Sequence, residues 1–187
     1  MDESSTDTLV KQVDIEFCCG LKKVKNEAEA REMAIAEIIT YSDVHKERVK
    51  ELNYEWLKKY ELWEPLDDEY LNNPQGMILD KGGHIFLASL DDEIIGTVAL
   101  LPHGEECMEV CKLAVDEQMR GRKIGRLLME KCIEASLTVG AKKVILYSSS
   151  KLQTALELYK KMGFVLVDDV NYKYEQADIK MELRIET

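Results

Sequence analysis

Residues 111–125 read CKLAVDEQMRGRKIG, and this stretch is the most informative part of the 187-residue chain. A strand is expected to end at Val115 and a helix to begin near Lys123, with Arg120-Gly121 in the turn between them. In such a unit the unpaired backbone N–H groups and the positive end of the helix dipole point at one place, which suits a pyrophosphate. Four cations add charge there: Arg120, Arg122, Lys123 and Arg126. An ordinary solvated helix start is the alternative interpretation.

The segments around this unit predict a mixed sheet with helices on its faces. Apolar runs bounded by turn residues predict strands at 36–41, 84–90, 93–101, 107–115, 143–147, 164–167 and 179–185. Apolar residues at helical spacing predict helices after the Ser42-Asp43 cap signal, at 67–71, at 123–139 and at 152–162, and residues 72–76 are predicted to form a loop. This order of elements predicts one mixed α/β (α+β) layered domain.

Length and composition predict about one globular domain. Apolar residues make up 45% of the chain and charged residues 33%. Residues 1–32 carry scattered charges without a clean period, so we interpret them as an N-terminal extension of unknown role, and the folded domain is expected over residues 33–187. The net charge of −11 at pH 7 disfavours nucleic acid and anionic membranes as partners, because both are bound through basic residues.

The cysteines and the first residues indicate a reducing compartment. The chain has five cysteines, an odd number, without a CxxC pair, and its three histidines are scattered, so neither a disulfide framework nor a metal site is expected. The start, MDESSTD, is acidic and unlike a signal peptide, and no apolar run approaches the about 20 residues of a membrane span. A soluble, cytoplasmic protein is therefore expected.

Two motifs resemble those of a known family. Residues 120–125, RGRKIG, resemble the acetyl-CoA motif Q/R-x-x-G-x-G/A of the GNAT superfamily of N-acetyltransferases, and residues 155–164, ALELYKKMGF, are similar to its A-x-x-L-Y-x-K-x-G-F signature. The resemblance covers about residues 34–187. It implies the GNAT fold, a mostly antiparallel central sheet with one splayed parallel strand pair and helices on both faces. It also implies direct transfer of an acetyl group from acetyl-CoA to a primary amine of a small molecule or peptide, without a metal, in a fold where homodimers are common.

The resemblance also implies roles for individual residues. Tyr159 matches the family tyrosine that faces the thioester sulfur, which makes it the candidate general acid. Glu109 stands six residues before Val115, the usual offset of a strand glutamate that acts as general base, with water as the alternative base. The expected cofactor-binding residues follow the strand end, the turn and the helix start: Leu113, Ala114, Val115, Gln118, Arg120, Gly121, Arg122, Lys123, Ile124, Gly125, Arg126, Ser150 and Tyr159.

Two positions depart from the family pattern. Lys123 stands where the motif has its first glycine, and Leu152 replaces an asparagine often found seven residues before the signature tyrosine. Ser148 or Ser150 is then expected to supply the missing polar contact. These departures keep open an alternative function, a non-catalytic acyl-CoA-binding regulatory module of the same fold.

The sequence says little about the acceptor. Residues 61–80 hold six acidic residues and no basic one, which would suit a cationic amine. Strand alternation is expected to place Glu109, Cys111, Leu113 and Val115 on one face of the sheet. Cys111, His84 and His103 are interpreted as structural residues rather than catalytic ones.

Overall fold

The computed structural model describes residues 36–168 and 173–185. These residues belong to one unit, which spans residues 35–187. The predicted extension, residues 1–32, lies outside the described residues, so its boundary and role stay predictions.

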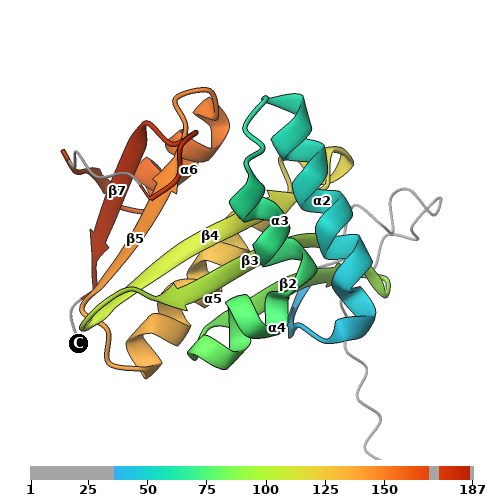
Figure 1. The fold of residues 1–187 in the computed structure, drawn as a ribbon, viewed down its shortest axis with the longest axis horizontal. Coiled ribbons are helices and arrows are strands. Elements are labelled where there is room, and N and C mark those ends of the chain that lie inside the picture. The colour runs from blue at the N-terminus through green and yellow to red at the C-terminus, as the bar shows by residue number, and fades with distance from the viewer. Residues whose placement is uncertain (1–35, 169–172, 186–187) are drawn as a thin grey trace, which may run out of the picture. The chain divides into compact units, whose positions relative to one another are not determined.

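In the part of the chain that the structure describes, seven strands form one mixed sheet in the order β1-β2-β3-β4-β5-β7-β6 (Figure 1). Neighbouring strands run antiparallel except β4 and β5, which are parallel. The prediction of a mostly antiparallel sheet with one parallel pair is confirmed. The strands are β1 Glu37–Thr40, β2 His84–Leu90, β3 Glu93–Pro102, β4 Cys107–Val115, β5 Lys143–Ser148, β6 Val165–Leu166 and β7 Ile179–Arg184.

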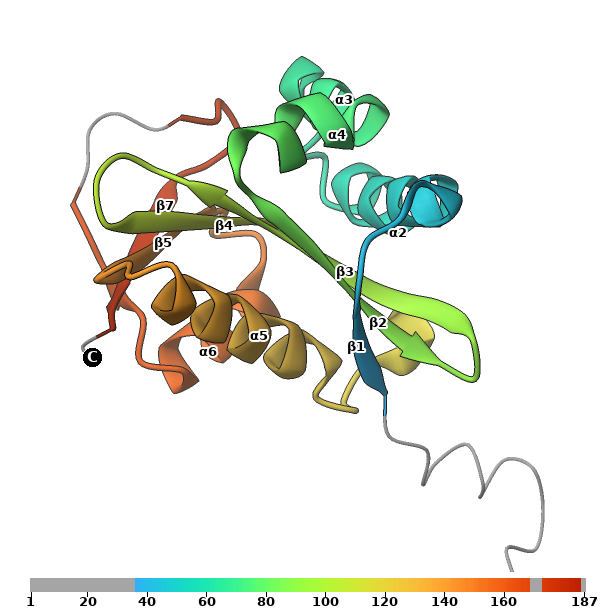
Figure 2. The ribbon, with the colours of Figure 1, turned by 90° about the horizontal axis from the view of Figure 1, so that it is seen from below.

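Helices cover both faces of the sheet, with α2, α3 and α4 on one face and α5 and α6 on the other (Figure 2). The helices are α2 Lys46–Lys59, α3 Pro65–Asn72, α4 Pro74–Met77, α5 Ile124–Thr138 and α6 Gln153–Lys161. Short 3-10 turns lie at η1 Asp43–His45, η2 Leu79–Lys81 and η3 Glu117–Met119.

The predicted loop at residues 72–76 is wrong, because a short helix begins inside it. The side chain of Asn73 accepts a hydrogen bond from the Gly76 N–H at 3.0 Å, and Pro74 occupies the first helical turn, where its missing N–H costs nothing. The helix before it also begins earlier than predicted, at Pro65, because Glu64 and Asp67 form a reciprocal capping box.

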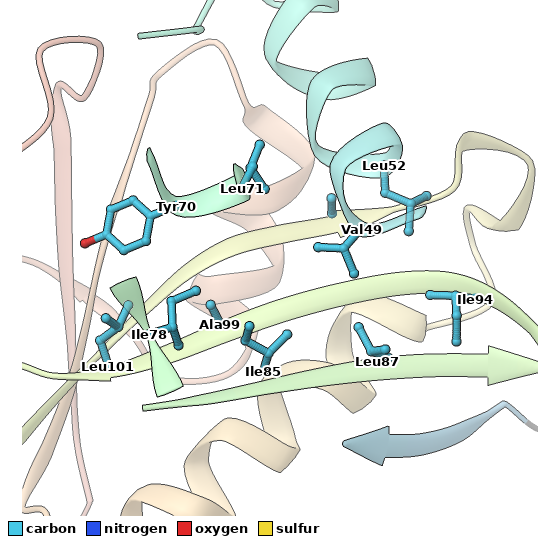
Figure 3. Close-up of a cluster of buried hydrophobic side chains, with 11 residues drawn as sticks. Val49, Leu52, Tyr70, Leu71, Ile78, Ile85, Leu87, Ile94, Ala99 and Leu101 are labelled. Atoms are coloured by element: carbon cyan, nitrogen blue, oxygen red, sulfur yellow. The ribbon is translucent and has the colours of Figure 1, made fainter. Parts of the chain in front are cut away.

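The main core lies between the sheet and helices α2–α4 (Figure 3). The spacing of Val49 and Leu52 predicts a buried helix face, and both side chains are buried against the sheet. On the opposite face α5 buries Leu128, Met129 and Cys132 completely. Each fully buried aliphatic side chain contributes about 1.5–3 kcal/mol to stability, so the two layers hold the sheet rigid between them. The core cluster under α2–α4 is Val49, Leu52, Tyr70, Leu71, Ile78, Ile85, Leu87, Ile94, Ala99, Leu101 and Ala114.

Candidate active site

The parallel strands β4 and β5 separate part-way along their length. They pair from Cys107 opposite Lys143 to Val110 opposite Leu146, after which β4 runs on to Val115 and β5 to Ser148. On the edge that faces β5, residues 111–115 of β4 therefore have no strand partner, and the two ribbons diverge there in Figure 1; we call this opening the gap. This is the splayed pair expected from the sequence, and it leaves β4 with an edge that an extended ligand can join.

A β-bulge in β4 lies beside this gap. Cys111 is paired with Ala99 on β3, whereas the next recorded pair joins Ala114 to Thr97. One extra residue of β4 is accommodated between these pairs, and Lys112 adopts a left-handed backbone with φ +54°. Such a bulge shifts the alternation of side chains along the strand.

The prediction that Glu109, Cys111, Leu113 and Val115 share one face of the sheet is wrong, because the bulge shifts the alternation between Cys111 and Val115. Cys111 packs against the core under α2–α4, and Glu109 lies on that side of the sheet, bonded to Tyr174. The Val115 side chain instead lies beside Gly125 at the start of α5, on the other side. The gap therefore has two differently built sides, one facing α5 and α6 and the other facing α2–α4.

The start of α5 is shaped as an anion site. Gly121 and the N-cap residue Lys123 both adopt left-handed backbones, with φ +78° and +63°. Lys123 thus keeps the conformation that glycine provides most easily, at a cost of about 1–2 kcal/mol. Its side chain makes no capping hydrogen bond, so the first N–H groups of α5 remain unpaired within the helix. These residues fit a pyrophosphate group.

Gly125 has a different role from Gly121. A Cβ atom at Gly125 would come within 3.3 Å of the Leu158 side chain, so this glycine allows α6 to approach α5 closely. A Cβ atom at Gly121 would meet nothing within 4 Å, and the need for glycine there is conformational.

The cations of the turn are partly neutralised. Arg120 pairs with Glu117 at 3.0 Å and lies over the Trp56 ring with its guanidinium carbon 4.5 Å from the ring centroid. Arg126 pairs with Glu130 at 2.7 Å. Among the described residues Lys123 has no ion-pair partner, so its charge is the more available one at the turn.

Trp56 links α2 to the end of β4 through a hydrogen bond that the sequence analysis did not predict. Its indole Nε1 donates to the Val115 carbonyl at 2.9 Å, and its ring stacks on Tyr60 with centroids 5.4 Å apart. The spacing of Trp56 on α2 predicts a core position, and only the folded structure shows that the indole N–H reaches the end of β4.

Tyr159 is buried in the α6 face, 7% exposed, beside Phe164. Burial raises the pKa of Tyr159 well above its usual value. Its hydroxyl therefore stays protonated through the neutral and alkaline range, which is the form that a general acid needs before the C–S bond of a thioester breaks.

Glu109 is 1% exposed and is surrounded by donors. Its carboxylate accepts from the Lys173 Nζ at 2.9 Å and from the Tyr174 hydroxyl at 2.6 Å, and it lies 3.2 Å from the His103 Nδ1. Burial, followed by the nearby Cys111 and Glu109, raises the pKa of Tyr174, so this hydroxyl remains a donor.

Sequence reasoning missed all three partners of Glu109. His103 follows β3 and Glu109 lies in β4, so the hairpin register, with Leu101 opposite Glu109, is the signal that brings them together. Lys173 and Tyr174 are 64 and 65 residues away in sequence and carry no local signal. Cys111 beside them is inert, because burial raises its pKa to about 12.

The acidic stretch 61–80 is largely occupied by structural contacts. Asp67 forms a buried ion pair with Lys112, and Glu64 accepts from the Gln176 N–H at 3.3 Å. Asp68 accepts from Tyr54 and Trp63; the Tyr54 bond and then the Trp63 bond lower the pKa of Asp68. These acids hold α3 in place, so the geometry gives no support to a free acidic wall for a cationic acceptor.

Ser148 and Ser150, the serines predicted to supply the missing polar contact, differ in their hydrogen bonding. The Ser150 N–H and hydroxyl both donate to Asp178 at 2.6 Å. Ser148, at the end of β5, has a buried hydroxyl with no hydrogen-bond partner among the described residues. Because buried hydroxyl groups normally have a hydrogen-bond partner, the unpaired Ser148 hydroxyl is a better candidate for a ligand contact than the Ser150 hydroxyl.

The chain is similar to known proteins in both sequence and fold. The sequence pattern of the "Acetyltransferase (GNAT) family" matches residues 48–164. The chain belongs to the GNAT family. It is an acyltransferase, as its two motifs predict. Residues outside the pattern, including all of β7, complete the GNAT sheet.

Relatives and solved structures agree with this membership. An uncharacterised N-acetyltransferase of Schizosaccharomyces pombe is 33% identical over 121 residues, 62% of this chain and 73% of that protein. The chain spans less than half the length of the rat N-acetyltransferases that it also matches. A GNAT acetyltransferase structure from Staphylococcus aureus superposes with a TM-score of 0.76 at 22% identity, covering 81% of this chain and all of that one. An N-acetyltransferase structure from Thermoplasma acidophilum, in complex with coenzyme A, has a TM-score of 0.64 at 17% identity, with 81% and 99% coverage.

Within residues 36–168 and 173–185, no group of three or more histidine, cysteine, aspartate or glutamate side chains is arranged to hold a metal ion. None of the helices in those ranges is both long and apolar enough to cross a membrane.

Proposed function

We propose that this GNAT protein transfers an acetyl group from acetyl-CoA directly to a primary amine of a small molecule or peptide. The observation that carries the proposal is the parting of β4 and β5 after Val110 and Leu146, between the start of α5 and the buried Glu109. Acetyl-CoA supplies the activated thioester carbonyl, and the chain supplies the positions of the groups around it.

The α5 side of the gap is proposed to hold the cosubstrate. The N–H groups of residues 121–126 would bind the pyrophosphate, with Lys123 as the available charge. The free edge at residues 113–115 would bind the pantetheine arm, with Gln118 at the turn. The orphaned Ser148 hydroxyl fits the polar contact that Leu152 cannot make better than Ser150 does, because Asp178 already engages Ser150.

The proposed catalytic steps use two buried residues, Glu109 in β4 and Tyr159 in α6. Glu109 accepts a proton from the acceptor ammonium, so that a neutral nitrogen attacks the thioester carbon. The C–N bond forms as the C–S bond breaks, and Tyr159 donates its proton to the departing sulfur. The second proton lost by nitrogen returns Tyr159 to its neutral form.

The test has a binding arm and a transfer arm. Thermal unfolding is measured with acetyl-CoA, CoA and ATP; a ligand at 100 times its Kd adds roughly 2.7 kcal/mol of stability. We expect a shift with both CoA species and none with ATP. Release of free CoA is then followed with a panel of amines. Binding without transfer to any amine would favour the non-catalytic acyl-CoA-binding module, and no shift would contradict both functions.

A further inference from the structure

The position next to the candidate base Glu109 is occupied by an amine of the chain itself. The Lys173 Nζ lies 2.9 Å from a Glu109 carboxylate oxygen. The same nitrogen lies 5.6 Å from the Tyr70 ring centroid and 5.1 Å from that of Tyr174. In Figure 3 the Tyr70 hydroxyl points away from the other labelled side chains of the core. Two aromatic rings and one carboxylate therefore hold a primary amine at the edge of the core.

This amine lies at the level where the strands part. Glu109 is opposite Ile145, one pair before the last pair of β4 and β5. An acyl group that enters the gap from the α5 side would emerge beside Glu109, on the side that faces α2–α4. We propose that Lys173 is an acetyl acceptor within its own chain, a self-acetylation site that uses the machinery of the proposed function and therefore rests on it.

The reaction balances with the groups already described. Glu109 takes one proton from the Lys173 ammonium and passes it to solvent. The neutral Nζ attacks the thioester carbon of acetyl-CoA, the C–N bond forms and the C–S bond breaks. Tyr159 protonates the leaving sulfur, and the second proton from Nζ restores Tyr159. The products are N-acetylated Lys173 and CoA.

Lys173 is poorly suited to acetylation without catalysis. Burial acts to lower the pKa of Lys173, but the hydrogen bond and charge of Glu109, with Tyr70, raise it overall. Its side chain is 32% exposed, whereas Lys142 and Lys161 are 72% and 73% exposed. Uncatalysed acetylation needs an accessible neutral amine, so it would modify Lys142 and Lys161 first. Catalysis in the site would reverse that order.

Acetylation would also change the surroundings of Glu109. The amide product has no positive charge, so Glu109 would lose its ion pair with Lys173 and keep Tyr174 and His103 as neighbours. Lys112 lies over the same two rings, but its ammonium pairs with the buried Asp67 and its side chain is 10% exposed, so we expect Lys173 alone to be modified at the site.

The experiment incubates the full chain with acetyl-CoA and follows peptide masses with time. We expect Lys173 to be modified before Lys142 and Lys161, at a first-order rate that does not depend on protein concentration. Glu109→Gln should slow Lys173 modification by about 10²-fold or more, the range of a general base, while leaving Lys142 and Lys161 unaffected. Tyr159→Phe provides a second variant should Glu109→Gln fail to fold. Lys173→Arg should abolish the fast phase, and Lys142→Arg is the matched control that keeps it.

The outcomes separate this inference from the proposed function. If acetyl-CoA stabilises the protein and amines are acetylated while Lys173 stays unmodified, only the self-acetylation is overturned. Modification of Lys142 and Lys161 before Lys173 would also overturn it. So would a rate of Lys173 modification in Glu109→Gln and Tyr159→Phe equal to that of the wild type. If acetyl-CoA produces no thermal shift, the proposed function fails and the inference fails with it.

Discussion

The two sides of the gap between β4 and β5 are encoded in different ways. On the side of α5, the strand end, the turn and the helix start come from one continuous stretch, residues 113–126. On the side of α2–α4, Glu109 is bonded to residues 6, 64 and 65 positions away, and Lys112 pairs with Asp67 from 45 positions away. The side of α5, proposed to bind the cosubstrate, is formed by neighbouring residues, whereas the side of α2–α4 is formed by contacts between segments far apart in the sequence. A short motif can therefore predict the cosubstrate, whereas the acceptor side depends on tertiary structure.

The largest effect is expected at Glu109, on the side of the gap that faces α2–α4. Glu109→Gln removes the proton acceptor but preserves the size of the side chain, so kcat/KM for an amine acceptor should fall by about 10²–10⁴-fold. The Kd for acetyl-CoA should not change, because the proposed cosubstrate contacts lie on the α5 side. Steady-state kinetics and calorimetry measure the two quantities. An unchanged kcat/KM would mean that water takes the proton and that Glu109 is structural.

Asp67 tests whether the acceptor side depends on long-range pairs. Asp67→Ala leaves the buried Lys112 ammonium without its partner and removes half of the α3 capping box. The free energy of unfolding should fall by about 3–5 kcal/mol, as measured by denaturant unfolding. Glu134→Ala is the control on α5: its side chain is 66% exposed and pairs with Lys131 one helical turn away, so a change within about 0.5 kcal/mol is expected. Similar losses of unfolding free energy in Asp67→Ala and Glu134→Ala would contradict the claim that the side of α2–α4 depends on long-range pairs more than α5 does.

Tyr159 tests the proton donor on the α6 side. Tyr159→Phe should lower kcat by about 10²-fold while acetyl-CoA binding is retained, because only the hydroxyl is removed. Since burial raises the pKa of Tyr159, the acidic form persists above the ordinary tyrosine pKa of about 10. The wild-type rate should therefore show no loss from Tyr159 ionisation below that pH. A fall in the wild-type rate on the alkaline side below pH 10, absent from Tyr159→Phe, would mean that Tyr159 ionises there and would contradict its raised pKa.

The smallest effects are expected at the turn before α5, where two left-handed residues form a matched pair. Gly121→Ala should lower the free energy of unfolding by about 1–2 kcal/mol, because φ +78° is unfavourable for a side chain. Lys123→Gly should change it by about 1 kcal/mol at most, in the stabilising direction, since relief of strain exceeds the entropy cost of glycine. Denaturant unfolding of both variants checks the signs. A stabilising Gly121→Ala would mean that the turn is built differently.

The fold was largely predictable from the sequence because its signals are local. The bounds of β2 and β4 match the predicted ranges, and α5 differs by one residue at each end. The bulge at Lys112 was not predictable, since nothing in CKLAV marks a left-handed residue, and it moved Val115 to the opposite face from Glu109. The helix at Pro74 was missed because Asn-Asn-Pro-Gln-Gly is typical of a loop, and the cap at Asn73 decides otherwise.

The site was predictable only in part, for the same reason. Tyr159 lies buried on its helix, as the apolar stripe predicts, while its role at the thioester stays a prediction; Lys123 adopts a left-handed backbone, which glycine favours. The partners of Glu109 depend on where residues 173 and 174 fold back onto β4, which no spacing rule gives. The acids of residues 61–80 suggested an open binding wall, yet Glu64 and Asp67 cap α3 and Asp67 also pairs with Lys112.

A structure of the full chain bound to CoA tests the central claim most directly. The account predicts the pantetheine arm between β4 and β5, bonded to the free edge at residues 113–115, with the pyrophosphate on the N–H groups of residues 121–126 and the sulfur between Tyr159 and Glu109. CoA bound at any other surface, with the gap between β4 and β5 filled by side chains of the protein, would contradict it.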